Sequence, residues 1–381
     1  MTWEMNILFL ALDVDLSAHR GDAIHTREIN ASLARAGHHV RLIAGADGPG
    51  GIIPGVETTI IPASGNLAVV SHVRKAIQSF HPDVIYERRY SPKISMTVSR
   101  LSGIPFVVEI NGIIEEEAAM AGRAMPDTPI QHAKSRIRRR MFGRAAAVIT
   151  VTEGLRDVIV QRFGVAPERV FVAENGVDSR LFRPIDPAQS RSTWGLSSGP
   201  LVCFVGNLVA WQGVDVLIEA MAALPTQVHL MIVGDGPSKR VLLQRTEELA
   251  LGNRVRFVGT IPHEKVPSCI SASNVCAAPF SSERNARSGV SALKVVEYLA
   301  CGRPVVVSDV PGAREIVDAY GCGLVVPPGD SSALASALAQ AIDDPTLGIG
   351  ALRASEFVRK ELSWDHTATI VLRVLDTVVR R

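Results

Sequence analysis

The sequence SGVSALKVVEYLACGRPVVVSD, residues 288–309, decides the fold, because signals for a loop, a helix, a turn and a strand follow one another within it. Ser291 is a candidate N-cap, and Val295 and Leu299 repeat at the spacing of one helix face. Gly302 is typical of a helix end, and the three valines after the next proline predict a buried strand. The stretch therefore predicts an α/β unit whose helix starts in a loop that contains glycine and serine.

The start of this helix is a candidate binding site for an anion. Its first N–H groups have no partner within the helix, and the helix dipole adds positive potential there. In open α/β sheets, phosphate groups bind at such helix starts. We therefore expect a nucleotide diphosphate against the backbone of Gly289, Val290 and Ser291, while Glu297 lies further along and suits sugar hydroxyls. The alternative is a helix that only packs in the core.

Composition limits the chain to a few classes. The 381 residues are 47% hydrophobic and 20% charged, which fits a globular protein of about two domains. A net charge of +2 does not require a nucleic-acid partner. The five cysteines lack the paired spacing of a metal site, and the N-terminal segment has the pattern of neither a signal peptide nor a membrane span. We expect a cytoplasmic protein with reduced thiols and no metal.

Strands and helices alternate along both halves of the chain. Apolar runs such as NILFLAL, HVRLIAG and PFVVEI alternate with amphipathic segments, and the pattern restarts at PLVCFVGNL. This alternation predicts two doubly wound parallel sheets that face each other across a cleft. The segment between them is rich in Pro, Ser and Gly, as linkers are. We expect a first domain over 1–182, a linker over 183–199, a second domain over 200–361 and a terminal helix over 362–381.

The run LKVVEYLACGRPVV resembles the donor-sugar segment of the retaining family 4 glycosyltransferases. Six other segments resemble that family in the same order, so the resemblance covers nearly the whole chain. They are GDAIHTREINASLARAGHHV, AENGVDSRLFRP, GNLVAWQGVDVLIEAM, VGDGP, FVGTIPHEKVP and PGAREIVD. The resemblance implies a GT-B fold of two Rossmann-like domains, with the acceptor on the first domain and the nucleotide sugar on the second. It also implies that the terminal helix crosses back to the first domain.

The resemblance assigns donor-binding roles in the second domain. In the family, the glutamate at the position of Glu297 holds the nucleotide ribose, and Glu315 contacts that ribose or lies behind it. The segment 258–261, with Gly259 and Ile261, would frame the base through backbone contacts.

This chain departs from the family pattern at three donor-side positions. The family has a second glutamate eight residues before Glu297, where this chain has Gly289, so that the N–H groups of Gly289 and Val290 remain for the donor sugar. Many relatives carry a basic pair five positions apart in the loop after the second domain's first strand, where this chain has Asn207 and Gln212. Another cation would then neutralise the diphosphate. The candidates are Lys294, Arg284, Arg287 and, from the first domain, Arg20.

Two residues of the first domain are candidates to face the donor. Gly21 has no side chain and would let the backbone approach the phosphates, although it also suits a simple helix entry. Asn111 ends a strand where many relatives place a histidine near the donor sugar, and an asparagine cannot transfer protons near neutral pH. We place Asn111, Gly289 and Lys294 nearest the reacting atoms.

The acceptor-binding residues remain open at this level. The candidates are His25 in the first helix, Tyr86 and Arg88 at a strand end, and Glu115 in an acidic run. The alternative for Glu115 is a surface acid that complements a helix dipole. The segment KSRIRRRMFGR suits weak contact with an anionic membrane surface, and a solvated helix face is its alternative. The residues concerned are Arg136, Arg138, Arg139 and Arg140.

These features predict a retaining glycosyltransferase that moves a sugar from a nucleoside diphosphate to an unidentified acceptor, without cofactor or metal. The leaving diphosphate would help to take the acceptor's proton in a same-face attack, so no side-chain nucleophile is required. A sugar-nucleotide epimerase or a phosphorylase on the same fold is an alternative. A protein that binds a sugar nucleotide without catalysis is another. The base, the sugar, the acceptor and the oligomeric state stay open.

Overall fold

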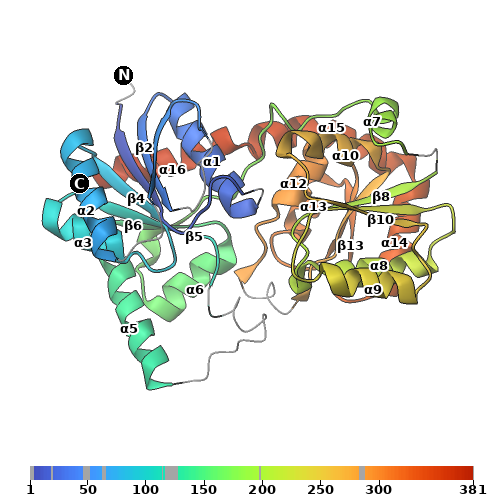
Figure 1. The fold of residues 1–381 in the computed structure, drawn as a ribbon, viewed down its shortest axis with the longest axis horizontal. Coiled ribbons are helices and arrows are strands. Elements are labelled where there is room, and N and C mark those ends of the chain that lie inside the picture. Colours follow the sequence, from blue (N-terminus) through green and yellow to red (C-terminus); the bar gives the residue numbers. More distant parts are fainter. Residues whose placement is uncertain are drawn as a thin grey trace. The chain divides into compact units, whose positions relative to one another are not determined.

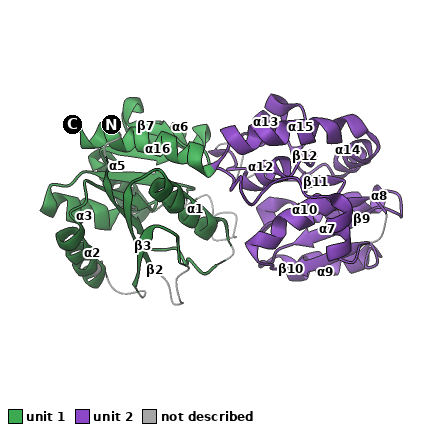
Figure 2. Ribbon diagram, turned by 90° about the horizontal axis from the view of Figure 1, so that it is seen from above, with its two compact units in different colours: residues 1–175, 364–381 green, residues 176–363 purple. Residues whose placement is uncertain are grey.

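The computed structural model describes residues 4–18, 20–45, 52–61, 66–113, 115, 128–196, 199–282 and 288–380. They fold into two compact units, shown in different colours in Figure 2. Unit 1 comprises Met1–Asn175 and Trp364–Arg381, and unit 2 comprises Gly176–Ser363. Each unit is built on its own parallel sheet (Figure 1), which confirms the predicted α/β class.

Unit 1 contains a seven-stranded parallel sheet in the order β3-β2-β1-β4-β5-β6-β7. Its strands are rich in valine and isoleucine and the central ones are buried on both faces, as parallel strands covered by helices must be. The strands are β1 Asn6–Ala11, β2 His39–Gly45, β3 Val56–Ile61, β4 Val84–Arg88, β5 Phe106–Ile110, β6 Ala147–Thr150 and β7 Val170–Val172. The helices are α1 Gly21–Arg35, α2 Asn66–Phe80, α3 Lys93–Ser102, α5 Pro129–Arg144, α6 Glu153–Phe163, the 3₁₀ turn η1 Pro167–Arg169 and α16 Trp364–Val379.

Unit 2 contains a six-stranded parallel sheet in the order β10-β9-β8-β11-β12-β13. One core packs α10, α12 and α15 on the sheet, and a second core packs α8 and α14 on the other face. The strands are β8 Leu201–Val205, β9 His229–Val233, β10 Val255–Gly259, β11 Val275–Ala278, β12 Val305–Ser308 and β13 Gly323–Val326. The helices are α7 Pro187–Thr193, η2 Ala210–Gln212, α8 Val214–Ala223, α9 Lys239–Glu248, η3 His263–Lys265, α10 Val266–Ala272, α12 Leu293–Ala300, α13 Arg314–Tyr320, α14 Ser331–Asp343 and α15 Pro345–Glu361.

The unit boundaries differ from the expected ones. The chain passes into unit 2 after Asn175, seven residues before the expected end at 182. The segment expected as a linker belongs to unit 2, because it forms α7, which packs on α10. Asp186 caps α7 by accepting the Gln189 N–H, so this Pro- and Ser-rich stretch has a helix start signal of its own.

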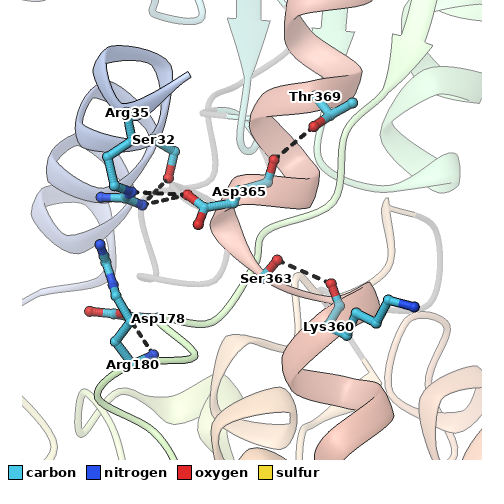
Figure 3. A network of polar contacts seen from close by, with 8 residues as sticks. All are labelled: Ser32, Arg35, Asp178, Arg180, Lys360, Ser363, Asp365 and Thr369. Atoms are coloured by element: carbon cyan, nitrogen blue, oxygen red, sulfur yellow. Dashed lines mark hydrogen bonds and ion pairs between the residues drawn. The ribbon is translucent and has the colours of Figure 1, made fainter. Parts of the chain in front are cut away.

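The chain returns to unit 1 at α16, which packs against α1. Figure 3 shows the polar contacts at this return. Arg35 of α1 forms an ion pair with Asp365 in the first turn of α16, with 2.5 Å between Nη2 and Oδ1. The same guanidinium donates to the hydroxyl of Ser32. The start of α16 is therefore fixed to the first helix of the chain.

Candidate functional site

The first candidate site lies in unit 2 at the start of α12. This helix begins at Leu293 after Ala292, so Ser291 is not the N-cap, contrary to the sequence prediction. The preceding loop is instead held by the backbone, where the N–H of Val290 donates to the carbonyl of Pro311. This N–H is therefore not left for a donor, contrary to the sequence prediction. Gly289 has a φ of +69°, a conformation that favours glycine. A glutamate at this position, as in the family pattern, would be strained.

Lys294 lies on α12 with its side chain directed to the loop after β8. Only 9% of the residue is exposed, and its Nζ donates to Oε1 of Gln212 over 2.5 Å. The ammonium also lies over the ring of Phe204, 3.9 Å from the centroid. A β-carbon on Gly206, which has a φ of +153°, would approach Nζ to 2.6 Å, so glycine makes the room for this contact. The structure thus brings Lys294 to one of the two positions where relatives carry basic residues.

The electrostatic state of Lys294 favours an anionic ligand. Burial lowers its pKa to about 7, and the nearby charge of Glu297 offsets only part of this effect. Among the described residues, no carboxylate lies within ion-pair distance of the ammonium. Because a buried cation is costly unless it is paired, an anion that reaches Nζ is bound strongly.

Glu297 lies one turn after Lys294 on α12, and its side chain is 12% exposed. Its Oε1 is 3.6 Å from Nε2 of His263 in η3. This Nε2 is buried and has no hydrogen-bond partner among the described residues, and the imidazole packs on Phe182. The sequence analysis missed His263. The signal was its place in FVGTIPHEKVP, two residues after the half-buried Ile261 that was expected to frame the base.

Other donor-side candidates lie close to this site along the chain. Asn207 is exposed in the loop after β8, and its Oδ1 lies over the backbone of Gly236 in the loop after β9. Gly259 is the last residue of β10, on the segment that leads to His263. Glu315 accepts the N–H of Gly312 over 2.5 Å, so it caps the start of its own helix α13.

The second candidate site lies in unit 1, where the carboxylate of Glu109 is buried at the end of β5. His25 of α1 places Nε2 2.7 Å from Oε1 of Glu109, and the hydroxyl of Tyr86 donates to Oε2 over 2.5 Å. The Nδ2 of Asn111 also donates to Oε1, and Nε of Arg88 lies 3.7 Å from it. One carboxylate therefore gathers four of the residues that the sequence analysis proposed separately.

The charge on Glu109 is fixed by these neighbours. Burial raises its pKa, but the charge and hydrogen bond of His25, with Arg88 and the Tyr86 hydroxyl, lower the pKa to about 2. Burial also raises the pKa of Tyr86 well above its usual value, with Glu109 adding to the effect, so the phenol stays a donor. The other nitrogen of His25 is 2.6 Å from Oδ1 of Asn175, so both ring nitrogens face oxygen atoms.

Two of these four residues are buried and two are half-buried. His25 and Tyr86 are buried, so they do not line a surface that an acceptor could touch, contrary to expectation. Asn111 and Arg88 are half-buried at the carboxyl edge of the sheet, where open α/β sheets bind ligands. The sequence analysis missed Glu109, although a lone acid in the apolar strand PFVVEI was a signal for a buried charge.

Two family models match the chain. The one described as Glycosyltransferase Family 4 matches residues 20–181, and the one described as Glycosyl transferases group 1 matches residues 189–360. The D-inositol 3-phosphate glycosyltransferase of Frankia alni is 30% identical over 312 residues, which cover 76% of this chain and 73% of that protein. The chain belongs to glycosyltransferase family 4.

Two further proteins are similar to this chain. The alpha-D-kanosaminyltransferase of Streptomyces kanamyceticus is 29% identical over 259 residues, which cover 66% of this chain, and the chain spans 64% of its length, just under two thirds. Anabaena HepE, solved in complex with UDP-glucose, has a TM-score of 0.78 and 22% identity, with 99% of this chain and 100% of that chain covered. This likeness confirms the predicted GT-B fold.

Some residues expected from the family 4 resemblance lie elsewhere or outside the described residues. Arg20 is exposed in unit 1 and pairs with Asp22, and Gly21 is the first residue of α1. Glu115 pairs with Arg138 instead of standing free for an acceptor, with 2.5 Å between Oε1 and Nη1. Arg284 and Arg287 lie outside the described residues. In the described part of the chain, no helix has the length and apolar content to cross a bilayer, and no three candidate ligands gather for a metal ion.

Proposed function

We propose that this protein transfers a sugar from a nucleoside diphosphate sugar to an acceptor, with retention at the anomeric carbon. The observation that carries the proposal is Lys294, a buried ammonium at the start of α12 whose hydrogen-bond partner is the neutral Gln212. A diphosphate supplies the charge that this ammonium lacks. The family's nucleotide-sugar chemistry and the UDP-glucose bound by HepE support this choice of ligand.

In the proposed complex, the diphosphate lies against the N–H groups of Gly289 and Ser291, with Lys294 neutralising its charge. Lys294 thereby replaces the basic pair of many relatives. The N–H of Val290 takes no part, because it donates to the carbonyl of Pro311. Glu297 accepts hydrogen bonds from the ribose hydroxyls, because its carboxylate is half-buried one turn beyond the ammonium. The segment with Gly259 and Ile261 contacts the base through its backbone.

The proposed mechanism uses the substrate's own phosphate as the base. The acceptor's nucleophilic atom attacks the anomeric carbon on the face from which the diphosphate leaves, and a phosphate oxygen takes its proton. Lys294 and the loop N–H groups stabilise the negative charge that grows on the leaving diphosphate. Asn111, which Glu109 holds through its Nδ2, presents its amide oxygen to sugar hydroxyls and transfers no proton.

A calorimetric panel of UDP-, GDP-, ADP- and TDP-sugars tests the donor. One nucleotide should bind, and Glu297→Ala should weaken its binding at least about tenfold, because a hydrogen bond to a charged group contributes roughly 1.5–3 kcal/mol. Glu264→Ala removes an exposed acid from the neighbouring turn η3 and is the matched control. If no nucleotide sugar binds, or if Glu297→Ala binds like the wild type, the assignment is wrong.

Activity assays with the nucleotide sugar that binds, together with a phosphorolysis assay on glycans, separate the alternatives. Conversion of the donor without any acceptor indicates an epimerase, and phosphate-dependent cleavage of a glycan indicates a phosphorylase. Tight donor binding without hydrolysis or transfer indicates a binding protein. The reason to test this alternative is that the chain departs from the family pattern at Asn111, Asn207, Gln212 and Gly289. We also propose a cytoplasmic location, where the five cysteines, all of them buried and free, stay reduced.

A further inference from the structure

A groove on unit 1 runs between α3 and α5, two helices that pack on the same face of the sheet. Its volume is about 540 Å³. Arg100 and Leu101 line it from α3, and Ile137, Arg140 and Arg144 line it from α5. The groove therefore combines three guanidinium groups with aliphatic side chains.

The charge at this groove is of one sign. Neither α3 nor α5 contains an aspartate or glutamate, although the whole chain has 40 basic and 38 acidic residues. Among the described residues, Arg100, Arg140 and Arg144 have no ion-pair partner. Arg138 is the exception on α5, because it is 8% exposed, lies over the ring of Tyr90 and pairs with Glu115. The expected membrane contact through Arg138 is therefore wrong.

A second pocket, in unit 2, is lined by arginines that have a structural role. It has a volume of about 260 Å³ and is lined by Arg191, Arg254 and Arg256. All three donate to backbone carbonyls, Arg191 to Ala272, Arg254 to Val228 and Arg256 to Trp194. The arginines of the α3–α5 groove make no such bonds to the described residues, so their charge is available to a ligand.

Exposed aliphatic side chains accompany these arginines. Leu101 is 63% exposed, Ile137 is 50% exposed and Ile130 is 66% exposed. Ile130 and Ile137 are seven residues apart, so they lie on one face of α5. A face that alternates cations with aliphatic groups complements the phosphates and the upper acyl chains of a phospholipid layer. It lacks aromatic side chains at the groove, which a single-stranded nucleic acid would use for stacking.

We propose that the α3–α5 face docks on an anionic phospholipid bilayer. Arg100, Arg140 and Arg144 bind the head-group phosphates, and Leu101 and Ile137 enter the boundary with the acyl chains. Each basic residue near such a surface contributes about 1 kcal/mol, so the contact is reversible and weakens as salt rises. The proposal is independent of the donor site, which lies in unit 2.

Vesicle co-sedimentation of the full chain tests this docking. The wild type should bind phosphatidylcholine vesicles that contain phosphatidylglycerol and should not bind phosphatidylcholine alone. Arg140→Gln/Arg144→Gln should bind about 30-fold more weakly, from about 1 kcal/mol per arginine. Leu101→Gln/Ile137→Gln should lose the binding that persists at high salt.

A matched control comes from α15, where Arg353 and the 64% exposed Phe357 share a helix with Glu356 and Glu361. Arg353→Gln/Phe357→Gln removes the same kinds of group and should bind vesicles like the wild type. Thermal melts should show that all variants are folded, and donor binding should be equal in all of them. Equal binding to both kinds of vesicle, binding to neither, binding to an RNA oligonucleotide but to no vesicle, or wild-type binding by the arginine variant would overturn the proposal.

Discussion

Lys294→Met tests whether the buried ammonium binds the diphosphate. The loss of one partner from a buried charge pair costs about 2–5 kcal/mol, so the donor should bind at least about 30-fold more weakly. The fold should not suffer, because methionine fills the same space beside Phe204 and no longer buries a charge. Lys265→Met, a change at an exposed lysine of unit 2, is the matched control and should bind the donor like the wild type.

The pH dependence of donor binding gives a second, sharper readout. The pKa of Lys294 is about 7 in the free protein, so above pH 7 its amine is increasingly neutral. A bound diphosphate favours the ammonium and raises this pKa, so donor binding takes up a proton above pH 7. The dissociation constant should rise towards tenfold per pH unit between pH 7 and 9, and Lys294→Met should show no such rise.

As pH rises above 7, the stability of the wild type should increase while its affinity for the donor decreases. The pKa of Lys294 is lower in the folded state than the usual 10.5, so between pH 7 and 10.5 the unfolded state binds more protons. The stability of the wild type therefore rises with pH in this window, and Lys294→Met lacks this rise. At pH 7 the variant should be more stable by on the order of 2 to 4 kcal/mol. Calorimetry and urea unfolding at several pH values measure both effects, and a variant that loses stability while binding the donor at wild-type affinity would refute the reasoning.

Three further changes test the other buried groups. Burial raises the pKa of Glu87 to about 7, so the wild type loses stability as pH rises from about 4.5 to 7. At pH 8, urea unfolding should show Glu87→Gln to be more stable than the wild type by up to about 3 kcal/mol. This difference in stability should close at pH 4. Glu109→Gln leaves His25 without its carboxylate, so the stability at pH 7 should fall by about 3–5 kcal/mol. The wild type should lose stability as pH falls from about 4.5 towards 2, because the pKa of Glu109 is lowered in the folded state, and the variant should lack this loss. Acid unfolding of both proteins measures the difference. His263→Phe removes the imidazole next to Glu297, so donor binding should weaken about tenfold. With a 2′-deoxyribose donor, the affinities of the variant and the wild type should differ less. If their affinities differ by the same factor for both donors, His263 has no role at the ribose.

The fold could be predicted from the sequence because both sheets are parallel. Their central strands are buried on both faces and therefore appear as short continuous runs of valine, isoleucine and leucine. The unit boundary could not be placed in the same way. The AENGVD segment reads as a single turn with no linker composition at Asn175, and only the contacts of the folded chain assign its two halves to different units.

The candidate site was predictable where one local segment forms it. Lys294 and Glu297 share the helix α12, so their spacing in the sequence already placed them on one face. The partners of these residues come from distant segments, and nothing local predicts them. Gln212 is 82 residues from Lys294, and His263 reaches Glu297 from the turn after β10. For the same reason, the sequence suggested His25 as a single candidate residue and not as the partner of a buried carboxylate 84 positions later.

Two of the buried charged groups, Glu109 and Lys294, differ in how fully their neighbours satisfy them, and this difference indicates which of the two binds a ligand. Tyr86 and Asn111 donate hydrogen bonds to the Glu109 carboxylate, and His25 and Arg88 lie within ion-pair distance of it. A ligand would therefore have to displace a partner to reach this carboxylate. The Lys294 ammonium has three protons to donate and one neutral oxygen acceptor among the described residues. Its remaining contacts are aromatic faces, which stabilise a cation less than an anion does. A ligand that brings negative charge therefore gains most at Lys294, while Glu109 keeps Asn111 in one orientation and does not itself bind.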